Sequence, residues 1–129
     1  MLHNSFLITN KNLTIKLDKN QKEKLSLLFK HYNVGNYIYP GVLIRELNID
    51  MYAAYDILGI LEKAGFLQEL YEVYCPNESK STGILYENLL DLLGDEVVQS
   101  CPECGGKINI QEDNILIFKV LKKVNMVYE

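Results

Sequence analysis

The sequence lacks a cluster of basic residues, and this absence argues against one broad class of function. Its 13 lysines and arginines are outnumbered by 17 aspartates and glutamates, which gives a formal net charge of −4. Residues 75–110 are especially acidic, with two basic and six acidic residues. Tight binding to nucleic-acid phosphates requires clustered lysines and arginines that displace counterions. The composition therefore disfavours tight, sequence-independent binding to DNA or RNA.

Long apolar runs are missing as well. No stretch approaches the roughly 20 apolar residues that a membrane span requires, and residues 1–10 lack the basic start and long apolar stretch of a secretory signal. Hydrophobic residues make up 48% of the chain and charged residues 23%, which is typical of a globular rather than a disordered protein. We therefore expect a cytoplasmic protein that contacts no membrane.

Cysteine occurs only three times, an odd number that does not suit a set of disulfides. Thiols stay reduced in the cytoplasm, so three cysteines there favour metal binding. Two of them belong to the segment Cys101-Pro102-Glu103-Cys104, which a pair of glycines follows. A Cys-x-x-Cys turn points two thiolates at one ion, and glycine supplies the positive φ that the turn needs.

The segment around Cys75 repeats this motif incompletely. Cys75-Pro76 matches Cys101-Pro102, but Glu78 stands where the second cysteine of a Cys-x-x-Cys would be. The two segments, about two dozen residues apart, resemble the paired knuckles of a zinc ribbon, in which two hairpins hold one tetrahedral ion. The resemblance implies a structural Zn²⁺ with Cys75, Cys101 and Cys104 as ligands and Glu78 as the candidate fourth.

Other interpretations of these segments stay open. A water molecule, His3 or His31 could take the fourth position instead of Glu78, or the ribbon could have lost its metal and be held by its hairpins alone. A thioredoxin-like redox pair is disfavoured, because such pairs begin a helix, whereas two glycines and an extended segment follow Cys104. A zinc hydrolase would need a general base in a polar pocket, and only Glu78 or Glu103 could be imagined in that role.

The first part of the chain predicts strands followed by a capped helix. Leu13, Ile15 and Leu17 alternate with polar residues, as in a half-buried strand, and Phe6–Thr9 is its expected hairpin partner. Asp18 takes the N-cap position of a helix, because Gln21 completes the spacing of a capping box. Apolar residues then follow at helical intervals, at Leu25, Leu28, Phe29 and Tyr32.

Two more helices are expected in close succession. Pro40 opens a short helix that ends near Leu47, and Asp50 caps the next helix directly after a tight turn. Gly65 ends this third helix. The residues from Phe66 to Cys75 are rich in aromatic and β-branched side chains, so an extended strand should follow.

This order of helix, helix, tight turn, helix, glycine and strand resembles a winged helix-turn-helix domain. The resemblance is carried by Ile49-Asp50 at the turn and by Leu61-Glu62-Lys63-Ala64-Gly65-Phe66-Leu67, which leads into the wing. An unrelated three-helix bundle is the alternative. The expected fold class is therefore α+β, with a winged helix-turn-helix domain and its N-terminal strands at 1–74. A small β-rich zinc-ribbon-like module, which includes a C-terminal strand, is expected at 75–129.

The third helix would carry the partner-binding face of such a domain. In a DNA-binding winged helix this element enters the major groove and presents basic or amide side chains to the bases. The outward positions here offer two tyrosines and two acids against one lysine, namely Tyr52, Tyr55, Asp56, Glu62 and Lys63. Carboxylates repel phosphates, whereas exposed tyrosines favour protein interfaces. We expect a protein-docking face, unless both tyrosines pack against the N-terminal strand or the ribbon.

The predicted domain order is similar to that of the alpha subunit of the general transcription factor E of archaea and eukaryotes. It is also similar to that of small accessory proteins in bacterial regulatory and anti-phage operons. Both resemblances imply a non-enzymatic module, either a protein-docking adaptor or an accessory subunit of a multiprotein complex, without catalytic residues. The alternatives are a DNA-binding winged-helix transcription regulator and the N-terminal fragment of a larger protein whose activity lies elsewhere.

Overall fold

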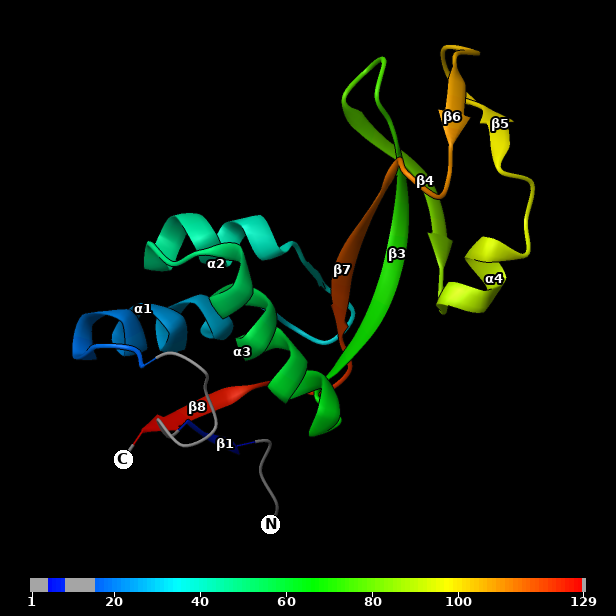
Figure 1. Cartoon of the computed structure of the whole chain (residues 1–129). Helices are drawn as coiled ribbons and strands as arrows, with labels where there is room; N and C mark the ends of the chain where they lie inside the picture. Colours follow the sequence, from blue (N-terminus) through cyan, green and yellow to red (C-terminus); the bar gives the residue numbers. More distant parts are fainter. Residues whose placement is uncertain (1–4, 9–15, 129) are drawn as a thin grey trace. The chain divides into compact units, whose positions relative to one another are not determined.

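The computed structural model describes residues 5–8 and 16–128 and is a mixed α+β fold, as the sequence predicts (Figure 1). Two compact units divide the chain. The helical unit consists of the described residues of Met1–Gln68 and Phe118–Glu129, and the hairpin unit consists of Glu69–Ile117. Within the described residues, none of the helices has the length and apolar character that a bilayer crossing requires.

The first helix of the helical unit begins at the predicted capping box. In α1 (Lys19–Lys30), the Gln21 N–H donates to Asp18 Oδ1 at 2.7 Å and the Asp18 N–H donates to Gln21 Oε1 at 2.9 Å. Leu25 and Phe29 are fully buried on one face of this helix. The helical spacing of apolar residues therefore identifies the side of α1 that faces the core.

The next two helices also follow local signals. Helix α2 (Pro40–Leu47) has Pro40 in its first turn and ends at Asn48, which adopts a left-handed φ of 54°. Asp50 caps α3 (Met51–Lys63) by accepting a 2.8 Å hydrogen bond from the Ala53 N–H. The buried face of α3 forms much of the core of this unit through Ala53, Ala54, Ile57, Leu58 and Leu61.

A four-stranded sheet has the strand order β2-β7-β3-β4. Its members are β2 (Tyr37–Ile38), β7 (Asn114–Val120), β3 (Leu67–Cys75) and β4 (Lys80–Tyr86). The short β2 pairs antiparallel with β7, and β3 pairs antiparallel with β4. A bulge interrupts the second pairing, where Thr82 Oγ1 donates to the carbonyl of Val73 at 2.8 Å.

The two chain ends pair with each other in a way that sequence periodicity did not indicate. Strand β1 (Ser5–Ile8) lies parallel to β8 (Asn125–Tyr128), and not in the expected hairpin with Leu13–Leu17. Residues 13–15 lie outside the described residues, and Leu17 is buried but not in a strand. The described residues from 118 onward, which were expected in the second module, therefore belong to the helical unit.

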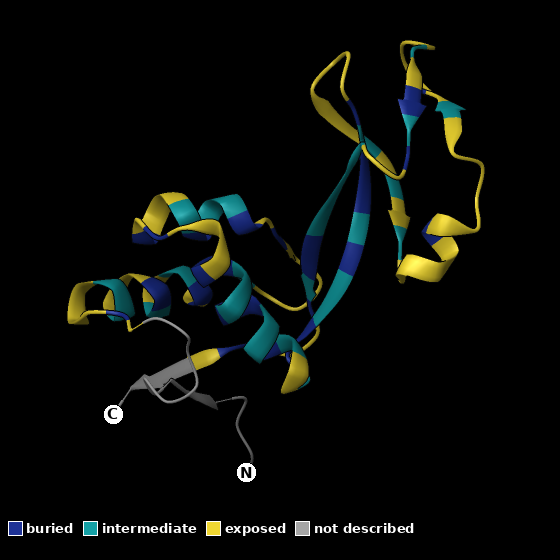
Figure 2. Ribbon diagram, viewed as in Figure 1, coloured by how far each residue is buried: buried dark blue, intermediate teal, exposed yellow. Residues whose placement is uncertain are grey.

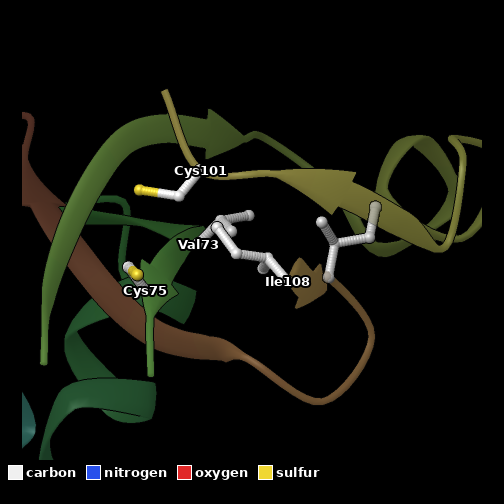
Figure 3. Packing of buried hydrophobic residues seen from close by; sticks show 5 residues of the cluster. Val73, Cys75, Cys101 and Ile108 are labelled. Carbon is white, nitrogen blue, oxygen red and sulfur yellow. The ribbon is translucent and has the colours of Figure 1, made fainter. Parts of the chain in front are cut away.

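The hairpin unit contains β4, the short helix α4 (Leu89–Leu93) and a hairpin of β5 (Val98–Ser100) and β6 (Lys107–Asn109). Its core is small. One cluster in it consists of five buried residues, with Ile84 and Tyr86 packed against them: Val73, Cys75, Cys101, Ile108 and Ile110 (Figure 3). Leu70, Leu92 and Ile117 of this unit are buried as well. A core of this size gives a marginal domain by itself, so such modules commonly need a metal or a disulfide.

Lys123 ties the C-terminal segment to the end of α1. Its ammonium donates to the carbonyls of Lys30 at 2.7 Å, Tyr32 at 2.8 Å and Phe29 at 3.2 Å. The last carbonyls of a helix have no partner within the helix, and the helix dipole favours a cation there. This contact therefore stabilises the helical unit over a long sequence separation.

Replacing Lys123 by Met should destabilise the protein by about 1–3 kcal/mol, because it leaves partly buried carbonyls without their charged donor. Urea unfolding followed by circular dichroism measures this loss. Lys122→Met is the matched control, since the Lys122 side chain is exposed, and it should change stability by less than about 0.5 kcal/mol. Equal stability of the two variants would contradict the role assigned to Lys123.

Candidate metal centre

Two hairpin tips bring the four predicted ligands together. Cys75 is the last residue of β3, and Glu78 lies in the turn to β4. Cys101 and Cys104 lie in the turn between β5 and β6. Segments that are separate in sequence thus meet at one place within the hairpin unit.

Backbone hydrogen bonds shape the second of these turns. The Cys101 N–H donates to the Gly106 carbonyl at 2.8 Å, and the Gly105 N–H donates to the Cys101 carbonyl at 2.9 Å. Gly105 has a φ of +72°, a conformation that residues with a Cβ rarely adopt. The expectation that a glycine provides the positive φ after Cys104 is confirmed.

The spacing of the donor atoms suits a tetrahedral ion. One ligand atom from each of Cys75, Glu78, Cys101 and Cys104 lies within 4.8 Å of all the others. Cys75 Sγ is 3.6 Å from Cys104 Sγ, and Cys101 Sγ is 3.9 Å from Glu78 Oε1. Zinc–sulfur bonds of about 2.3 Å at tetrahedral angles place two sulfurs about 3.8 Å apart. All three cysteines are free thiols, so their sulfurs are available to a metal.

The four donors divide into a buried and an exposed pair. Cys75 and Cys101 are 1% and 5% exposed and belong to the core of the hairpin unit, where Figure 3 shows them beside Val73. Cys104 and Glu78 are exposed. An ion held by all four would therefore join the core to the outer parts of both turns.

Two hydrogen-bond donors around Cys104 were not anticipated from the sequence. The Gly106 N–H lies 3.4 Å and the Asn77 amide 3.7 Å from its sulfur, and both hydrogen bonds lower the pKa of the Cys104 thiol. Burial, by contrast, raises the pKa of the Cys75 thiol. A Cβ on Gly106 would come within 3.3 Å of Cys104 Sγ, so glycine also keeps this sulfur accessible. The only sequence signal for Asn77 was its place between Cys75 and Glu78.

An exposed ion pair links the same two turns. Lys80, at the start of β4, pairs with Glu103 at 2.5 Å. Hydrogen bonding and charge attraction from Glu103 raise the pKa of the Lys80 ammonium. Exposed ion pairs contribute little to stability, so this contact adds little to the association of the two turns. Of the two histidines considered as ligands, His31 is the C-cap of α1, and His3 lies outside the described residues.

The residues of the predicted docking face on α3 differ in exposure, although their spacing places them all on one side of the helix. Tyr52 is 78% exposed, but Tyr55 is half-buried, and its ring centroid lies 6.5 Å from that of Phe118 in β7. Burial accordingly raises the pKa of the Tyr55 hydroxyl. Asp56 and Glu62 are half-buried and Lys63 is exposed. The face thus carries one projecting tyrosine rather than a pair.

Comparison with known proteins identifies no relative. No protein-family model matches the chain, and no curated protein or solved structure matches it. What the site can do is therefore inferred from its own donor atoms and their surroundings.

In metal-free protein, iodoacetamide should alkylate Cys104 about tenfold or more faster than Cys75, because the thiolate is the reacting species and Cys104 is exposed with a lowered pKa. Peptide mass spectrometry over a time course measures both rates. Asn77→Ala should slow the reaction at Cys104, since it removes a hydrogen bond that favours the thiolate. Equal rates at Cys75 and Cys104 would show that the turns do not hold the described geometry without metal.

Proposed function

We propose that this chain is a non-enzymatic protein-docking adaptor whose hairpin unit is held together by one structural Zn²⁺. The observation that carries the proposal is the convergence of Cys75, Glu78, Cys101 and Cys104, whose ligand atoms lie within 4.8 Å of one another. The resemblance in domain order suggests that the adaptor serves as an accessory subunit of a bacterial regulatory or anti-phage complex.

The donor set favours zinc over harder ions. Thiolates select soft or borderline metals, whereas magnesium and calcium prefer sites built entirely from oxygen. Three sulfurs and one carboxylate oxygen complete a tetrahedral shell and leave no open position for substrate. Together with the small core of the hairpin unit, this supports a structural rather than a catalytic metal.

The fold supports a winged helix-turn-helix as the scaffold. Helices α1, α2 and α3 follow one another in the expected order, with the tight turn before Asp50, and β3 begins two residues after Gly65. Strand β7 lies between β2 and β3 in the sheet. We propose that β2, β3 and β7 complete the winged domain, and that the zinc-ribbon-like segment is an insertion between β3 and β7.

A DNA-binding regulator is the alternative function. It would use the outer face of α3, which carries Asp56 and Glu62 against one exposed lysine, Lys63. Carboxylates on that face oppose phosphate contact, so the charges favour a protein partner. Retardation of duplex DNA in a gel at low salt, lost as salt rises, would instead favour the regulator.

Protein purified without chelators should contain about one zinc per chain, with an affinity that depends on Glu78. Glu78→Cys should tighten zinc binding, because it completes a site of four thiolates. Glu78→Ala should weaken zinc binding by about 10–100-fold or more, because losing a residue that only hydrogen-bonds to a metal ligand already costs about this much. Elemental analysis gives the stoichiometry, and competition with a chromophoric chelator gives the affinities.

Glu103→Ala is the matched control, because Glu103 is an exposed carboxylate in the turn of Cys101 and Cys104 that pairs with Lys80 and is not among the four clustered donors. Its zinc affinity should equal that of the unaltered protein. Zinc affinities that respond to neither substitution of Glu78 would show that the fourth ligand is water or another residue. Purified protein without any metal would favour a ribbon that has lost its ion.

A further inference from the structure

Helix α4 exposes an unusual amount of apolar surface for its length. Its five residues are Leu-Leu-Asp-Leu-Leu, and of its leucines only Leu92 is buried, at 1% exposure. Leu89, Leu90 and Leu93 are 48%, 81% and 47% exposed. Most of α4 is accordingly in the yellow of exposed residues in Figure 2. Contiguous exposed apolar residues of this kind are a feature of interaction sites.

The segments next to α4 in the sequence carry further exposed apolar residues. Val97, directly before β5, and Val98, its first residue, are 39% and 57% exposed, and Leu85 of β4 is 37% exposed. Strand β4 contacts α4 directly, and Figure 1 shows the two side by side. The leucine surface is defined here as Leu85, Leu89, Leu90, Leu93, Val97 and Val98.

The helix is held firmly despite its exposure. Asn88 caps it by accepting from the Asp91 N–H at 2.9 Å, and Leu92 anchors it in the core. The Tyr86 hydroxyl donates to Asp95 Oδ2 at 2.6 Å, which joins a residue two positions before the N-cap to the residue directly after the C-cap residue Gly94. The exposed leucines are thus presented by an ordered helix, and a preorganised surface loses little conformational entropy on binding.

The charged residues next to α4 in the sequence are acidic. Residues 81–106 contain no lysine, arginine or histidine. Glu103 of this segment pairs with Lys80 in the ligand-bearing turns, and the other four acidic residues, all exposed, are called the acidic rim: Glu87, Asp91, Asp95 and Glu96. Asp95 and Glu96 also line a hollow of about 540 Å³ together with Val98, Gln99, Ser100 and Lys107. An acidic rim around an apolar centre matches an apolar segment flanked by cations.

We propose that the leucine surface is a docking site for a protein segment that presents apolar side chains between lysines or arginines. The proposal rests on the adaptor function and assigns its docking to α4 and the neighbouring strands, not to α3. A second copy of the chain is a poorer occupant. A twofold-symmetric contact would place the same acidic rim against itself, and like charges oppose such an interface.

The candidate metal ligands lie at both ends of the segment that carries this surface. Strand β4 begins two residues after Glu78, and β5 ends directly before Cys101. An ion that joins the two turns therefore fixes both ends of residues 79–100, which include α4. Removing the ion should loosen the leucine surface and weaken docking even though none of its side chains is a ligand.

Selection from a phage-displayed library of random 12-residue peptides on zinc-loaded protein tests the proposal directly. Selected peptides should carry apolar residues flanked by lysine or arginine, and their affinity should fall as salt rises. In ¹⁵N-labelled protein, they should shift the amide signals of residues 85–98. Leu90→Asp should weaken binding at least tenfold. Leu27→Asp is the matched control, because Leu27 of α1 is 55% exposed, and it should leave binding unchanged.

Three results would overturn the docking assignment. The selected peptides could lack basic flanks, or the shifts in amide signals could be confined to α3. The peptides could also bind the Leu90→Asp and Leu27→Asp variants with equal affinity. Failure to enrich any peptide also overturns it, as does a concentration-dependent dimer that Leu90→Asp abolishes. Zinc content measured on the same samples separates the two proposals. Full zinc without peptide binding refutes only the docking site, whereas peptide binding by protein that holds no zinc refutes only the structural metal.

Discussion

The convergence of two hairpin tips on one small volume is the constraint on which the hairpin unit depends. The unit has few buried residues, and two of these are the thiols of Cys75 and Cys101. Buried thiols can pack as small apolar groups, but the nearby Cys104 and Glu78 add two further donors at metal-binding distance. A metal at this point would supply folding free energy that so small a core does not provide.

The position of this unit along the chain gives the proposed metal a wider effect. The unit includes most of β3 and the start of β7, which are neighbours in the sheet. The same turns that carry the ligands lead into β4 and out of β5, and these strands bound the segment that presents α4. The proposed metal would therefore connect the folding of the unit with the placement of α4 and with the proposed docking.

The features predicted correctly from the sequence are those set by residues close together in the chain. The capping box of Asp18 and Gln21, the cap at Asp50, the positive φ at Gly105 and the approach of Cys101 to Cys104 all depend on spacings of a few residues. The repeated Cys-Pro motif was enough to join Cys75 to the same site, because two matching turns favour a shared ion.

The features that the sequence did not indicate depend on contacts between distant segments. Alternating apolar residues predict a strand but not its partner, so the parallel pairing of β1 with β8 was not anticipated. The spacing of Tyr52 and Tyr55 predicts one helix face, but packing against Phe118 removes Tyr55 from the exposed surface. Leu89, Leu90 and Leu93 fit the spacing of an ordinary amphipathic helix, and only the structure shows that all three are exposed.

Zinc K-edge X-ray absorption spectroscopy on the purified protein tests the central claim most directly, because it reports the donor atoms without any substitution. The proposed site predicts a four-coordinate ion with three sulfurs at about 2.3 Å and one oxygen at about 2.0–2.2 Å. A shell with fewer than three sulfurs, or a six-coordinate shell of light atoms, would contradict a centre built from Cys75, Glu78, Cys101 and Cys104.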